Sequence, residues 1–206
     1  SQLTTTEAVR LLSVVADIVG FAHSHGVCHR DLKPDNIVIS NVGQPYVIDF
    51  GLALLSHAWQ EDLLIEGAVS GTPRYMSPEQ ANGQSSQTDA RTDVFSLGAI
   101  LFEILTGQPL YPGDRVTDVL GLAKNGDFDP SRLAMAGIPK RLQAVCLKAI
   151  SKSPSARFNN ALELGEALRQ LQPQSKARWL IFAAAMLVIV AGFALFRFLP
   201  TPSAGK

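Results

Sequence analysis

One short stretch of the chain concentrates the side chains that chemistry needs. Residues 29–36, HRDLKPDN, place a carboxylate (Asp31), an ammonium group (Lys33) and an amide (Asn36) on one loop. Two short apolar runs follow and read as a hairpin, and a further carboxylate, Asp49, comes at the end of the second run. We therefore interpret these four residues as one candidate site.

The chemistry that this set suits is phosphoryl transfer from a nucleotide. That reaction needs hard oxygen ligands for Mg²⁺, a cation at the transferring phosphate, and a carboxylate that orients the attacking hydroxyl and accepts its proton. Asn36 and Asp49 can supply the ligands, Lys33 the cation and Asp31 the carboxylate. An isolated aspartate is more often a turn or capping residue, and it is the combination that favours a site.

The elements around the candidate site can be predicted from hydrophobic spacing. A helix is expected over about 7–24, capped by Thr5 or Thr6, because apolar residues recur at helical spacing. The apolar runs 37–39 and 46–48 predict a small hairpin. Residues 51–92 show little periodicity, as a long functional loop would.

The second half of the chain reads as helical. Residues 94–105 are apolar on nearly every side, which is typical of a helix in the middle of a domain. Weaker helical patterns cover about 115–124, 138–150 and 159–171. We predict a mostly helical globular part, 1–172.

Further segments of the sequence resemble motifs of a known protein family. The segment 71–79, GTPRYMSPE, is similar to the one that closes the activation loop of protein kinases, and 93–98, DVFSLG, to the start of their central buried helix. Over roughly residues 5–172 the chain resembles the C-terminal lobe of a eukaryotic-like serine/threonine protein kinase of the type also found in bacteria. The implied fold class is protein-kinase-like: a mainly α-helical C-terminal lobe with a small β-hairpin at the catalytic loop, plus one transmembrane helix.

The resemblance implies ATP and Mg²⁺ as cofactors and a role for each site residue. Asp31 would be the catalytic base, and Asn36 and Asp49 would be the Mg²⁺ ligands. Lys33 would neutralise the γ-phosphate, and Val38 would lie beneath the adenine.

Other residues would align this site. By the same resemblance, His29 and Phe50 would pack in the spine of the lobe, with Phe50 and Gly51 completing the Asp-Phe-Gly motif. Asp93 would hold the backbone of the catalytic loop. His23, in contrast, has no partner visible in the sequence and is interpreted as a surface or packing residue.

Residues around the 71–79 segment indicate a branch of the kinase family, and they also indicate an ion pair. Lys33 two residues after Asp31, together with Thr72, matches the serine/threonine branch. Arg157 falls where the family has an arginine that pairs with the glutamate at position 79, Glu79. In a sharper hypothesis, the acidic residues within 61–66 mimic an activation-loop phosphate opposite Arg30. The simpler interpretation is a solvated loop face.

The family's small N-terminal lobe cannot be placed in this chain, so we expect the piece alone to lack useful kinase activity. Two interpretations stay open. The chain is either the C-terminal portion of a membrane-anchored serine/threonine kinase or a membrane-tethered, pseudokinase-like binding or scaffold module. Aminoglycoside-type phosphotransferases share the Asp and Asn spacing but lack the 71–79 segment.

A membrane span is predicted near the end of the chain. The run from Trp179 to Phe196 carries no charge and would be roughly 27 Å long as a helix, close to the bilayer's hydrocarbon thickness. We predict a linker over 173–178, a transmembrane helix over 179–199 and a short tail over 200–206. The protein would be a single-pass cell-membrane protein whose kinase lobe faces the cytoplasm, where ATP and protein substrates are found.

Composition limits the partners. The 18 Lys and Arg balance the 18 Asp and Glu, which argues against nucleic-acid binding. With 47% hydrophobic and 17% charged residues, the chain is not a disordered polyelectrolyte. The expected partners are a protein substrate with a Ser or Thr acceptor and the membrane, and a homodimer is possible.

Overall fold

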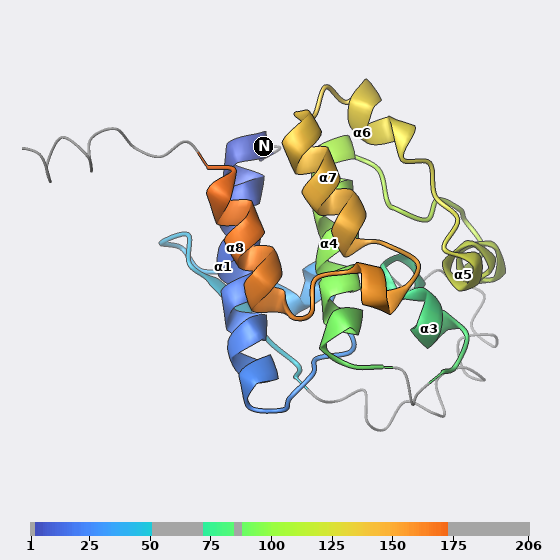
Figure 1. Ribbon diagram of the computed structural model, residues 1–206, viewed down its shortest axis with the longest axis horizontal. Coiled ribbons are helices and arrows are strands. Elements are labelled where there is room, and N and C mark those ends of the chain that lie inside the picture. Colours follow the sequence, from blue (N-terminus) through green and yellow to red (C-terminus); the bar gives the residue numbers. More distant parts are fainter. Residues whose placement is uncertain (1–2, 51–71, 85–87, 173–206) are drawn as a thin grey trace, which may run out of the picture. The chain divides into compact units, whose positions relative to one another are not determined.

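The computed structural model describes residues 3–50, 72–84 and 88–172 (Figure 1). By its contacts the chain divides into two compact units, Ser1–Gln172 and Pro173–Lys206. The account below concerns the described residues of the first unit. The linker, transmembrane helix and tail predicted for 173–206 lie outside the described residues.

The described part is mainly helical, with one two-stranded antiparallel sheet, in agreement with the predicted class. Its α-helices are α1 (Thr5–Ser24), α3 (Pro78–Ala81), α4 (Ala90–Thr106), α5 (Val116–Asn125), α6 (Ser131–Met135), α7 (Lys140–Ala149) and α8 (Ala161–Gln170). Its strands are β1 (Ile37–Ile39) and β2 (Pro45–Val47), and its 3₁₀ turns are η1 (Pro34–Asn36), η3 (Thr72–Tyr75) and η5 (Pro154–Ala156).

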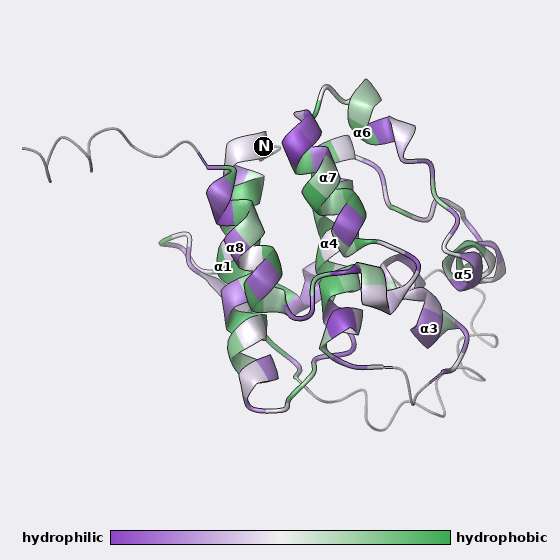
Figure 2. Cartoon of the chain, viewed as in Figure 1, coloured by the Kyte–Doolittle hydropathy of each residue, from purple (hydrophilic) through white to green (hydrophobic). Residues whose placement is uncertain are grey.

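Helix α4 forms the centre of the core. Twelve of its 17 residues are buried, among them Phe95, Leu101 and Phe102 with no exposed surface, and Figure 2 colours much of the helix as hydrophobic. It begins at the Asp89 cap and ends at Gly107, which adopts the left-handed conformation that suits glycine. The apolar run therefore predicted this helix and its environment, while the polar first turn extends it beyond the predicted start.

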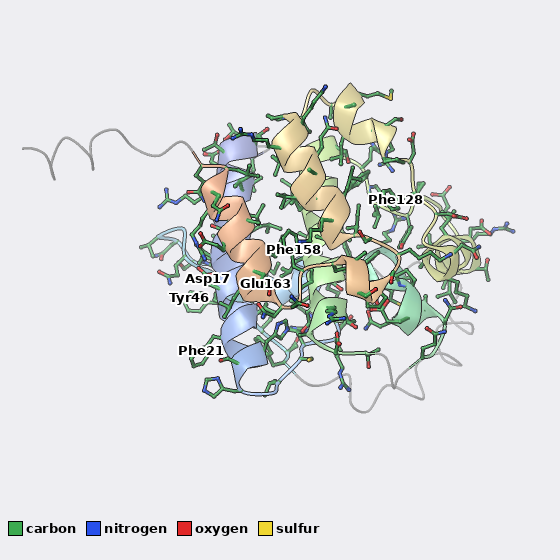
Figure 3. All side chains as sticks on the ribbon, viewed as in Figure 1. Asp17, Phe21, Tyr46, Phe128, Phe158 and Glu163 are labelled. Carbon is green, nitrogen blue, oxygen red and sulfur yellow. The ribbon has the colours of Figure 1, made fainter. Side chains whose placement is uncertain are left out.

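Helices α1 and α8 lie side by side (Figure 1). The N-terminus of α1 has a capping box in which Thr4 and Glu7 satisfy each other's backbone donors. Arg169 of α8 donates to both carboxylate oxygens of Asp17 on α1, at 2.6 Å. Phe21 lies on the outer side of α1 with 67% of its surface exposed (Figure 3).

The hairpin sets the geometry of the candidate site. Val38 pairs with Tyr46, one residue out from the Ile37–Val47 pair. Ile48 N donates to Asn36 O at 3.0 Å, so the residue before β1 and the residue after β2 are adjacent at the open end. This adjacency brings the 29–36 loop next to Asp49.

Three differences from the sequence-based expectation are local. The cap of α1 is Thr4 and not Thr5 or Thr6, because Thr4 lies three residues before Glu7 and completes the capping box. Helices α3 and α6 were not predicted, because elements of four and five residues are too short to show a hydrophobic period. The second strand begins one residue earlier than expected, at Pro45. Within the residues that the structure describes, no helix is long and apolar enough to cross a membrane.

The close approach of α4 to α7 gives a stability prediction. A Cβ added at Gly98 would lie 2.7 Å from Ile150 Cγ2 and 2.8 Å from Ala149 Cβ, so Gly98→Ala forces the core apart. We expect it to destabilise the protein by about 1–3 kcal/mol. The matched control is Gly121→Ala on α5, where nothing lies within 4 Å. That change should stabilise by roughly 0.5–1 kcal/mol. Urea unfolding measures both, and equal stabilities would contradict the packing.

Candidate active site

The buried carboxylate of Asp93, at the start of α4, holds the 29–36 loop by its backbone. Asp93 Oδ2 accepts a hydrogen bond from His29 N at 2.8 Å, and Oδ1 accepts one from Arg30 N at 2.7 Å. The side chain is fully buried. Because a buried carboxylate must find donors, these two amides fix the loop where it enters the site.

His23, on α1, supplies the third hydrogen bond to Asp93. Its Nε2 lies 2.8 Å from Asp93 Oδ2, and its Nδ1 lies 3.3 Å from the backbone N of Ala161. Since a backbone N–H only donates, Nδ1 is the acceptor and Nε2 carries the proton given to Asp93. The interpretation of His23 as a residue without a partner was wrong. Its partner is 70 positions away, and no local pattern signals it.

His29 joins the loop to the end of β2. Its Nε2 lies 2.8 Å from Ile48 O and must donate to it, so Nδ1 is free to accept from Asp31 N at 3.3 Å. Its ring lies 4.7 Å, centroid to centroid, from the ring of Phe50. One imidazole therefore ties the residue before Asp49 to the backbone of Asp31.

Asp31 is held on both sides while its carboxylate stays accessible. Asn36 Nδ2 donates to Asp31 O at 2.8 Å, and Lys33 Nζ lies 3.0 Å from Asp31 Oδ2. The Asp31 side chain keeps 32% of its surface exposed and that of Lys33 keeps 20%. The preceding residue, Arg30, is half-buried and has φ 66°, a strained backbone conformation for a residue with a Cβ. A fixed backbone thus presents a solvent-accessible carboxylate.

Asn36 and Asp49 present oxygen atoms at the open end of the hairpin. Asn36 is buried, and because its Nδ2 is used by Asp31 O, its Oδ1 is the atom left to accept. Asp49 is exposed and has φ 63°. Neither Asn36 Oδ1 nor the Asp49 carboxylate has a hydrogen bond within the described ranges. An amide and a carboxylate oxygen are donors of the kind that Mg²⁺ prefers, so this pair fits that ion.

Of the remaining predicted site residues, the structure describes some and not others. Val38 on β1 is 46% exposed beside the site, as a surface for a ligand would be. Thr72 begins η3. Gly51 and the acidic residues within 61–66 lie outside the described residues.

Glu79 on α3 and Arg157 after η5 form a buried bidentate ion pair. Nη1 and Nη2 of Arg157 lie 2.7 and 2.8 Å from the two Glu79 oxygens, and Thr92 Oγ1 donates to Glu79 Oε1 at 3.0 Å. Burial alone would raise the pKa of Glu79, but the hydrogen bonds and charge of Arg157 lower that pKa below its ordinary value. The Arg157 guanidinium also lies 4.8 Å above the ring of Phe95. The pair fixes α3 against the core.

This fold and this arrangement of residues define a class of protein. The chain belongs to the protein kinase domain family, whose match covers residues 1–168. The family expected from the motifs is thereby confirmed.

The relatives narrow the class. The chain is 40% identical over 157 residues to serine/threonine-protein kinase PknB of Mycolicibacterium smegmatis, covering 76% of this chain and 25% of the relative. It is 38% identical over 162 residues to serine/threonine-protein kinase PknB of Mycobacterium tuberculosis, covering 79% and 26%. A probable serine/threonine-protein kinase PknB of Corynebacterium glutamicum is 34% identical over 172 residues, covering 82% and 26%. The chain thus spans about a quarter of the length of these curated relatives.

The Glu79–Arg157 pair predicts a pH dependence of folding. Because the folded pKa of Glu79 is lowered from 4.5, its contribution to stability is complete above that value and is lost as the pH falls through the folded pKa. Glu79→Gln should remove this slope in acid. At pH 7 it should destabilise by about 3–5 kcal/mol, since it leaves Arg157 buried without its counter-charge.

Urea unfolding between pH 3 and 7 measures both effects. The control is Asp118→Asn, which removes an exposed Arg115–Asp118 pair and should change stability little. Equal losses in the two variants at pH 7 would contradict a structural role for the buried pair.

Proposed function

We propose that the protein is a serine/threonine protein kinase that transfers the γ-phosphoryl group of ATP to hydroxyl groups of protein substrates. The observation that carries this proposal is the convergence of Asp31, Lys33, Asn36 and Asp49 at one end of the hairpin, on a backbone held by Asp93 and His29. Membership of the protein kinase domain family and the similarity to serine/threonine-protein kinases support it.

Each of these side chains has a distinct task in the proposed reaction. Asp31 orients the substrate hydroxyl and accepts its proton as the oxygen bonds to the γ-phosphorus and ADP leaves. Lys33, next to Asp31, offsets the charge of the transferring phosphoryl group. Asp31 is suited to this task because the carboxylate is exposed while its peptide groups are fixed.

Asn36 and Asp49 are the residues proposed to hold Mg²⁺. When bound there, the ion would supply positive charge that offsets the charge of the nucleotide phosphates. The orientation of the Asn36 amide supports this role. Nδ2 donates to Asp31 O, and Oδ1 is therefore the amide atom left to bind a cation. The exposed Val38 is proposed to contact the adenine.

The membrane setting is also part of the proposal. The uncharged run from Trp179 to Phe196 supports a single span of the cell membrane, with the kinase lobe on the cytoplasmic side where ATP is found. Serine- or threonine-containing proteins at that face would be the substrates. The relatives' greater length leaves room for elements beyond this chain.

A second candidate function is a membrane-tethered scaffold module that binds a partner without phosphorylating it. The hairpin favours it by exposing five large apolar side chains: Val38 at 46%, Ile39 at 50%, Val42 at 83%, Tyr46 at 56% and Ile48 at 41%. Such a surface is suited to being covered by another part of a kinase or by a separate partner.

Substitution of Asp31 tests the proposed function. In the full-length protein, Asp31→Asn should reduce phosphoryl transfer from ATP to dephosphorylated casein by about 10²–10⁴-fold, because the proton acceptor is lost while the side-chain shape is kept. Radiolabelled γ-phosphate measures the transfer, and phosphoamino-acid analysis identifies the acceptor.

The control is Asp129→Asn, which changes an exposed aspartate whose hydrogen bonds go to Ser131 at the start of α6, and it should leave transfer unchanged. Transfer by the parent that survives Asp31→Asn would refute the assigned role. No transfer by the parent with Mg²⁺ present, together with normal folding, would favour the scaffold function.

A further inference from the structure

The orientation of the peptide group between Arg30 and Asp31 affects the position of the proposed base, Asp31. Arg30 has φ 66°, which is disfavoured for a residue with a Cβ and persists only when neighbours hold it. Its N–H is held by Asp93 Oδ1 at 2.7 Å. Its carbonyl belongs to the same peptide unit as the N–H of Asp31, so whatever holds that carbonyl also orients Asp31.

Gln80 on α3 holds this carbonyl. Its Nε2 lies 2.6 Å from Arg30 O, across 50 positions of sequence. The other end of the amide, Oε1, lies 3.2 Å from both N and Oγ of Ser77. Because Ser77 N can only donate, Oε1 must face Ser77 and Nε2 must face Arg30. No other hydrogen bond to Arg30 O is found in the part of the chain that the structure describes.

Gln80 acts from a fixed platform. Ser77 caps α3, and the adjacent Glu79 is anchored by the buried pair with Arg157. Asn82 extends the attachment by donating to Lys124 O, next to the end of α5, at 2.9 Å. A short helix that is attached to the fold through Glu79 and Asn82 can therefore hold a second element in place, and Gln80 is the side chain that reaches the 29–36 loop.

We infer that Gln80 is a positioning residue for Asp31. Its amide couples α3, at the end of the 71–79 segment, to the peptide group that joins Arg30 to Asp31. This inference rests on the proposed function of Asp31. It goes beyond that function by naming a contact through which the segment around α3 sets the orientation of the 29–36 loop. The hydrogen bonds between Gln80 and Ser77 are local to the start of α3, whereas the contact of the same amide with Arg30 O depends on the tertiary fold.

Gln80→Glu separates the two contacts of this side chain. A carboxylate can still accept from Ser77, as glutamate does in a capping box, but it cannot donate to Arg30 O. We expect kcat for phosphoryl transfer by the full-length protein to fall roughly 10–100-fold, since small misplacements of a catalytic group have effects of this size. The KM for ATP should stay within about twofold and the melting temperature within a few degrees, because the cap is kept.

The matched control is Gln143→Glu. Gln143 Nε2 also donates to a backbone carbonyl, Ile138 O, at 2.6 Å, but it does so on α7, away from the site. This variant loses the same kind of hydrogen bond and should keep the parent's kcat. Unchanged kcat in Gln80→Glu, or equal losses of kcat in both variants, would overturn the inference.

Amide hydrogen exchange supplies a readout that does not need activity. Gln80→Glu should speed exchange in the peptide that contains residues 29–36, and Gln143→Glu should not. If Asp31→Asn leaves transfer unchanged while this exchange still rises, the role of Asp31 fails but the contact of Gln80 with the loop stands. Exchange and kcat both equal to those of the parent would overturn the positioning role, whatever the result for Asp31.

Discussion

A carboxylate withdrawn from water must be surrounded by donors, and in this protein that requirement falls on Asp93. Its three hydrogen bonds come from His23 on α1 and from the backbone of His29 and Arg30. Losing any one of these donors would leave the buried charge less well satisfied, so α1, the 29–36 loop and the start of α4 stabilise one another's positions. Asp93 thus fixes the point at which the 29–36 loop enters the proposed active site.

The segment before α4 is held by a second buried charge, the carboxylate of Glu79. Glu79 is paired with Arg157, which also donates to Arg91 O, Ser151 O and Lys152 O. The guanidinium thus satisfies several carbonyls at the ends of helices while it neutralises Glu79. Buried ion pairs contribute little net stability but are costly to break. Their effect here is to fix α3 in one place, and Gln80 extends from that helix to the 29–36 loop.

The backbone is strained at two positions of the proposed site, one in the 29–36 loop and the other at Asp49. Arg30 and Asp49 both have positive φ values, although neither is glycine, and each lies beside a residue held by His29. Such conformations are maintained only where the surroundings determine them fully. In the proposed kinase reaction Asp31 and Asp49 both act on the nucleotide and its acceptor, and the backbone that carries them is held by hydrogen bonds of His29.

The sequence by itself determined the residue types at the candidate site, the hairpin between Asn36 and Asp49, and the central helix around Phe95 and Leu101. These features are encoded locally, by short spacings and hydrophobic runs, and such signals are legible in a single chain. The resemblance to protein kinases rested on the same contiguous segments. The short helix α3 was missed because four residues show no period.

Only the tertiary structure decided which distant side chains complete the site. No local pattern indicates that His23 is the partner of Asp93 or that Gln80 is the partner of Arg30, because these contacts join residues 50 or more positions apart. Hydrogen bonds of this kind depend on the packing of α1, α3 and α4, and packing follows from the whole set of buried side chains. Local sequence thus specified the chemistry, and the core specified its geometry.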